Sequence, residues 1–145
     1  MKPVVTWILL ASTRHASVAV NHGPGKGLAL LSGKEWTSQE ADLPRDRAGM
    51  GHSIGGHGVS AVGQADPQKK IDADFAQAVA RGVAKALKAK EFDRLIIVAG
   101  PHMLGLLRAE LDHESRAVLL GEIDKDLTGQ PMPAVASHVE GLIVV

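Results

Sequence analysis

The sequence predicts one α/β domain over residues 1–145, built around a five-stranded mixed sheet. Three observations predict this class. Three strand-like segments joined by short turns come first, a long glycine-rich segment follows, and helical and strand-like patterns then alternate to the end of the chain. Short turns join antiparallel strands, whereas parallel strands need a helical crossover between them. The expected order is therefore β-β-β-α-β-α-β-α.

The first three segments should form an antiparallel meander. Val4–Ala11 is apolar on both of its alternating faces, which is typical of a central strand covered on both sides. His15–Asn21 alternates between apolar and polar residues and predicts a half-exposed strand. Leu28–Thr37 follows a glycine-proline turn and predicts a third strand, which Gly33 weakens.

The second half of the chain alternates helices and strands. Asp66-Pro67 predicts a helix start, since aspartate caps helices and proline suits the first helical position. Apolar residues then recur at helical spacing as far as Leu87. The later elements are the strand Leu95–Ala99, a helix opened by Gly100-Pro101, the strand Ala117–Ile123, the helix Pro131–Val139 and an apolar tail, Leu142–Val145, expected to pack on the core. We expect a central first strand, parallel to the fourth and fifth. This is the order of ribonuclease H-like folds, which says little about activity.

Composition excludes several classes of function. The chain has no cysteine, which rules out disulfides, thiolate zinc sites and cysteine nucleophiles. Lys+Arg and Asp+Glu both number 16, so the formal net charge is zero, and aromatic residues make up only 3%. Dedicated nucleic-acid binders usually carry a basic excess and aromatic stacking surfaces, so composition argues against that class.

The N-terminal apolar run raises the question of targeting. It is short, Thr6 interrupts it, and Arg14 follows closely, so we interpret it as a buried strand rather than a signal peptide. No stretch approaches the roughly 20 apolar residues that span a bilayer. The sequence therefore predicts a cytoplasmic protein without a membrane span.

Leu43–Asp66 breaks all periodicity, with six glycines and two histidines. Long connections of this kind are usually functional or disordered, and we expect Gly49–Gln64 to be the most mobile segment. As a contact element, the segment would use Arg45, Asp46 and Arg47 as its polar anchors. An alternative of equal weight is that this arginine-aspartate cluster only holds the segment against the sheet.

The patterns of common catalytic sites are missing. Two-metal nucleases need acidic residues at strand ends, but the first strand has none and the fourth ends in Ala99-Gly100. Gly23–Gly27 lacks the spacing of a phosphate-binding loop, and the turn after the fourth strand has no serine nucleophile. His52 and His57 lie five apart without an adjacent acid, so we expect exposed histidines rather than metal ligands. No metal or cofactor is predicted.

One edge of the predicted sheet carries candidate binding residues. His102 lies just beyond the carboxyl end of the fourth strand, where open α/β sheets place ligands. Lys125 and Asp126 follow the fifth strand and should lie near the same edge. These three residues predict a small-molecule site. The alternatives are that His102 is a capping or exposed residue and that Asp126 stabilises its own turn.

Several motifs, taken in order, resemble the bacterial host attachment proteins. The matching segments are Trp7–Ala11 with Arg14–Ala16, Asp42–Gly49, His57, Asp66-Pro67, Phe75 and Phe92–Thr128, which together span nearly the whole chain. Two positions depart from the family pattern. Ser12 stands where the family often has Asp or Asn, and Ala99–His102 replaces its usual Ala-Pro-Pro-Arg turn.

The resemblance implies a role in the attachment of bacteria to host cells. We expect a non-enzymatic binding or adaptor domain with an unknown protein or surface partner. The family is also distantly similar to the middle domain of eukaryotic and archaeal peptide-chain release factors, where a Gly-Gly-Gln loop hydrolyses peptidyl-tRNA. Here the matching loop has Gly55-Gly56-His57, so the hydrolytic activity is not carried over. The alternative is a release-factor-like protein that contacts ribosome-bound tRNA.

Overall fold

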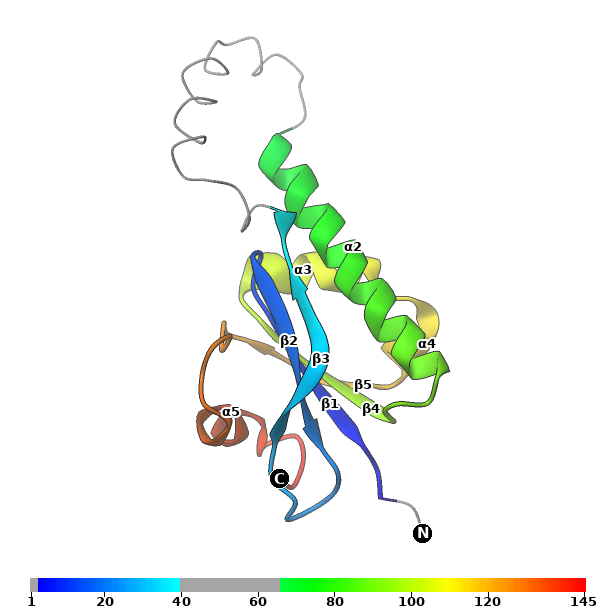
Figure 1. The fold of residues 1–145 in the computed structure, drawn as a ribbon, viewed down its shortest axis with the longest axis vertical. Helices are drawn as coiled ribbons and strands as arrows, with labels where there is room; N and C mark the ends of the chain where they lie inside the picture. The colour runs from blue at the N-terminus through cyan, green and yellow to red at the C-terminus, as the bar shows by residue number, and fades with distance from the viewer. Residues whose placement is uncertain (1–2, 40–65) are drawn as a thin grey trace.

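The computed structural model describes residues 3–39 and 66–145 and shows a five-stranded sheet with helices on both faces (Figure 1). The strands are β1 (Thr6–Ala11), β2 (His15–Asn21), β3 (Ala29–Thr37), β4 (Arg94–Ala99) and β5 (Leu119–Asp124). They lie in the order β3-β2-β1-β4-β5. β2 is antiparallel to both β1 and β3, whereas β1, β4 and β5 are parallel. The predicted mixed sheet with a central first strand is confirmed. The ribonuclease H-like comparison stays a prediction that rests on this order.

Helices connect β3 to β4 and β4 to β5, and a last helix follows β5. The described helices are α2 (Pro67–Lys88), α3 (Pro101–Glu110), α4 (His113–Ala117) and α5 (Met132–Val139). The predicted start of the long helix is confirmed, because the Asp66 side chain accepts a hydrogen bond of 2.9 Å from the backbone N–H of Gln68. Among the described residues, no helix combines the length and apolar character needed to cross a membrane.

Two apolar clusters hold the sheet between the helix layers. α2 and α3 cover one face, where Trp7, Leu9, Val79, Ile97 and Leu107 meet. α5 and the end of the chain cover the other face, where Ile8, Leu10, Ile96, Val98 and Val135 meet. β1 and β4 contribute alternate side chains to both clusters and are buried on both faces, as continuous apolar runs predict.

The second strand corrects the prediction of half-exposure. Ser17 and Asn21, the expected solvent-facing residues, are only 6% and 2% exposed. The strand lies between two neighbours and is covered on both faces. The Asn21 side chain is satisfied locally, since its amide donates to the Gly27 carbonyl and its oxygen accepts from the Gly23 N–H. A short polar residue is therefore buried here by bonding its own turn.

The region before the fifth strand also differs from the prediction. Ala117 belongs to the short helix α4, and the strand begins only at Leu119. Asp112 caps this helix through the Ser115 N–H, a local signal too short to show periodicity. At the chain end Ile143 packs on the core as expected, whereas Val144 is 71% exposed.

Candidate functional site

The carboxyl ends of the parallel strands meet at one edge of the sheet. The register aligns Ala11 of β1 with Ala99 of β4, and Ala99 with Asp124 of β5. The turns that follow these three residues therefore lie side by side. Open parallel sheets bind their ligands at this edge, because backbone groups and helix starts converge there.

A cavity of about 210 Å³ opens at this edge, and we call it the edge cavity. Its lining residues are Ser12, Thr13, Gly100, Pro101, His102, Met103 and Asp126. The structure thus brings together His102 and Asp126, two residues singled out from the sequence. Lys125 is exposed in the neighbouring turn but does not line the cavity.

His102 is exposed at its outer side but anchored at Nε2. This nitrogen lies 2.9 Å from the Asp72 Oδ2 atom of α2, and the carboxylate accepts the bond. The Asp72 side chain is only 7% exposed, and its Oδ1 accepts from the Gln68 side chain at 2.8 Å. The histidine therefore has a fixed partner on α2, while its Nδ1 remains the nitrogen available to a ligand.

Asp126 acts in two ways. It lines the edge cavity, and its Oδ1 accepts from both the backbone N–H and the hydroxyl of Thr128. The second contact is the turn-stabilising role considered from the sequence. Both interpretations thus apply to the same carboxylate.

Sequence reasoning missed Asp72, although a signal was present. Asp72 lies three residues before Phe75 on the buried side of α2, where all the other buried residues are apolar. An acidic residue on such a stripe needs a polar partner, since burying an unpaired carboxylate is costly. That partner is His102, which is thirty positions away in the sequence.

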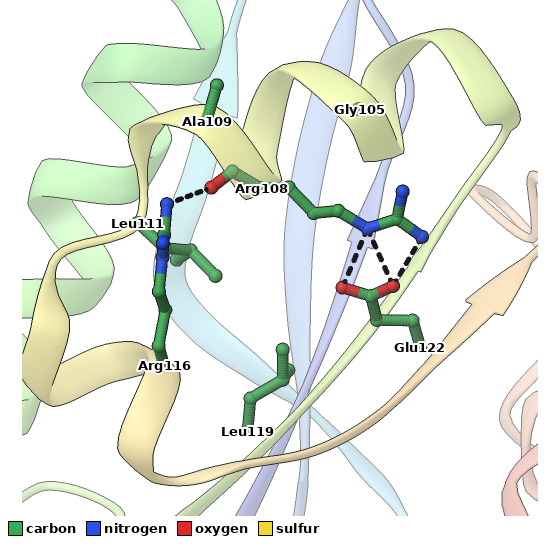
Figure 2. Close-up of a pocket in the computed structure, with 7 residues that line it drawn as sticks. All are labelled: Gly105, Arg108, Ala109, Leu111, Arg116, Leu119 and Glu122. Carbon is green, nitrogen blue, oxygen red and sulfur yellow. Dashed lines mark hydrogen bonds and ion pairs between the residues drawn. The ribbon is translucent and has the colours of Figure 1, made fainter.

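A second and larger cavity lies between β5 and the helices α3 and α4, and we call it the β5 cleft (Figure 2). It measures about 530 Å³, and its lining residues are Gly105, Arg108, Ala109, Leu111, Arg116, Leu119 and Glu122. Arg108 donates from Nε and Nη2 to Glu122 at 2.8 and 2.6 Å. The hydrogen bond and the charge of Glu122 raise the pKa of Arg108 above its ordinary value.

A bulge in β5 shapes the β5 cleft. Leu95 pairs with Leu119, but Ile96 pairs with Gly121, so one extra residue is accommodated on β5. Residues three apart on a regular strand face opposite sides. The extra residue lets Leu119 and Glu122 face the same side, toward α3. The sequence pattern alone does not reveal such a bulge, and the cleft was not predicted.

The remaining predicted residues lie outside the described part of the chain. Arg45, Asp46, Arg47 and His57 belong to residues 40–65, as does nearly all of the glycine-rich segment. The same is true of the expected mobility of Gly49–Gln64. Within residues 3–39 and 66–145, no three histidine or acidic side chains gather as a metal-binding group.

Comparison with known protein families decides the relationship. The family described as "Protein required for attachment to host cells" matches residues 7–139. The chain belongs to this family. The match includes β1 from Trp7 onward, the edge cavity and the β5 cleft, and confirms the relationship expected from the sequence motifs. A comparison with curated proteins found no match for this chain.

Proposed function

We propose that this host attachment family protein is a binding or adaptor domain, not an enzyme, which contacts its partner at the sheet edge around the edge cavity. Membership of the family suggests the role in attachment to host cells. The proposal adds the surface: His102 and Asp126 from the described residues, Lys125 beside them, and Arg45, Asp46 and Arg47 from the segment that joins β3 to α2.

One observation carries this proposal. The described chain stops after β3 and resumes at α2 beyond the end of the sheet where α3 begins (Figure 1). Before the segment, the Ser38 N–H donates to the Arg14 carbonyl, one residue past the cavity-lining Thr13. After the segment, α2 starts at Pro67 and reaches Asp72, the partner of His102, within two turns. The described residues on either side of the segment therefore connect to the sheet edge that carries the edge cavity.

The hydrogen bonds at the edge support binding over catalysis. Ser12, His102 and Asp72 are the residue types of a serine hydrolase. However, the Ser12 hydroxyl donates to the His15 carbonyl and accepts from the backbone N–H groups of Arg14 and His15. A nucleophilic serine must instead donate to the histidine that takes its proton. This serine stabilises its own turn.

The test is partner capture by the complete chain. Replacing both Arg45 and Arg47 with alanine should reduce the captured material at least about tenfold, since charged hydrogen bonds contribute strongly to interfaces. The thermal midpoint should stay nearly unchanged. The control replaces two exposed cations of α2, Arg81 and Lys88, with alanine and should capture normally.

The alternatives give different outcomes. Normal capture by the double variant would exclude the arginines as anchors. Unfolding of the variant would show that they pin the segment to the sheet. Enrichment of ribosomal components, lost in the same variant, would favour the release-factor-like alternative, in which the domain contacts ribosome-bound tRNA.

A further inference from the structure

The β5 cleft contains a cation that is held in place by a backbone carbonyl and forms no ion pair within the described part of the chain. Arg116 of α4 donates from Nη2 to the Arg108 backbone carbonyl at 2.7 Å, in the last turn of α3 (Figure 2). Among the described residues no carboxylate pairs with Arg116. A guanidinium carries five N–H donors, so most of this group remains available.

Arg108, by contrast, is already neutralised. Glu122 accepts two of its N–H groups, and Asp124 adds a second nearby negative charge. A ligand anion near Arg108 would meet the Glu122 carboxylate. The end of the cleft at Arg116 is therefore the favourable place for a negative group.

The rest of the lining is apolar and leaves space. Leu111 and Leu119 supply hydrocarbon surface, and α3 presents only Gly105 and Ala109 beside Arg108. A Cβ added at Gly105 would meet no atom within 4 Å, so this glycine faces open space. The volume of about 530 Å³ lies within the usual range for small-molecule sites.

These features define the chemistry of the ligand. Two guanidinium groups and one carboxylate give the lining a net charge of +1. A single negative charge balances this lining, whereas a doubly charged phosphate would exceed it and be repelled by Glu122. We propose that the β5 cleft binds a monocarboxylate with an apolar body, its carboxylate on Arg116 and its apolar part against Leu111 and Leu119.

Two sources can supply this chemistry. One is a free aliphatic or aromatic acid, and the other is the C-terminal carboxylate of a polypeptide that ends in an apolar residue. Among the described strands β5 lies at an edge of the sheet, so a peptide would also find backbone groups for strand pairing beside the cleft. The site is separate from the edge cavity, so this proposal and the proposed function can fail independently.

The test uses NMR titration of the complete, ¹⁵N-labelled chain. The probes are hexanoate, phenylacetate and the peptide Gly-Ser-Gly-Val-Leu, each beside its carboxamide. We expect saturable shifts of the Gly105, Arg116 and Leu119 amides with the acids and at least about tenfold weaker effects with the amides. The proposal is overturned if no acid shifts these signals, or if acids and amides act alike. Tighter binding of the peptide, with shifts along β5, would identify a polypeptide source; equal or tighter binding of the free acids would identify a small molecule.

Variants then locate the carboxylate. Arg116→Gln should weaken acid binding about tenfold, whereas Arg81→Gln, an exposed arginine of α2, should leave it unchanged. Glu122→Gln should strengthen binding several-fold because it removes the repelling charge. Gly105→Leu should block the cleft while α3 remains folded, since leucine favours helices. Equal affinities in Arg116→Gln and the unmodified chain would exclude the assigned carboxylate position.

Discussion

Two helical glycines show how local space decides the value of a single residue. Gly82 of α2 faces Trp36 of β3, and a Cβ there would lie 2.5 Å from the Trp36 Cζ2 atom. Gly105 of α3 faces the open β5 cleft. Glycine weakens a helix interior by up to about 1 kcal/mol relative to alanine in both cases. Only at Gly82 does close packing require a residue without a side chain.

Alanine at these positions should therefore have opposite effects on the free energy of unfolding. Gly105→Ala should stabilise the protein by about 0.4–1 kcal/mol, because it restricts the unfolded chain and meets no atom. Gly82→Ala should destabilise it by about 1–3 kcal/mol, because the bulky indole must move. Urea unfolding of both variants measures the difference. Similar stabilisation in the two would mean that Trp36 yields freely.

The candidate sites show what single residues reveal before the fold is known. His102 and Asp126 were predictable because each follows a recognisable strand, and strand ends of one direction share an edge. Asp72 stands out in the sequence as an acid on an apolar helix stripe, but its pairing with His102 depends on the packing of α2 against α3, which residue patterns do not encode. Arg108 and Glu122 are ordinary surface charges in the sequence, and only the β5 bulge makes them neighbours.

At the scale of elements, the strength of the local signal decided what could be predicted. The long helix was predictable from Asp66-Pro67 and a long apolar stripe, and β4 from a continuous apolar run. The helix α4 was missed because five residues give too few turns for a period to emerge. This short helix nevertheless carries Arg116, the cation of the β5 cleft.

The cap of α4 makes its stability depend on pH. The Ser115 N–H donates to Asp112 at 2.8 Å, and this bond lowers the pKa of Asp112 below its ordinary value. The ionised cap therefore stabilises the folded state above the unfolded pKa, and this contribution disappears as pH falls through the folded pKa. Asp112→Asn keeps a capping oxygen but does not titrate.

We accordingly expect a smaller fall of the thermal midpoint in Asp112→Asn than in the unmodified chain between about pH 5 and pH 2. Asp112→Ala, which removes the cap, should cost about 1 kcal/mol at neutral pH. Thermal unfolding followed by circular dichroism at several pH values measures both. Parallel pH profiles for the unmodified and Asn proteins would show that this cap does not contribute to acid sensitivity.

At the scale of the whole molecule, two apolar layers share one pair of strands. The layer under α2 and α3 and the layer under α5 both use β1 and β4, whose side chains alternate between them. The two proposed binding regions lie at different borders of this body, one at the carboxyl ends of the strands and one along β5. Because both depend on the same central strands, loss of either layer should unfold the sheet as a unit.

Hydrogen exchange of the native chain tests this coupling. Leu107→Ala removes buried contacts from the first layer and should cost about 2–5 kcal/mol, while Val135→Ala removes contacts from the second and should cost roughly 2 kcal/mol. In the unmodified chain the slowest amides should be those of β1 and β4, which exchange only on global unfolding. Each variant should then lower the protection of these amides by its full loss of stability. If Val135→Ala instead accelerated exchange only around α5 and left β1 protected, the second layer would be a separate unit that opens without the sheet.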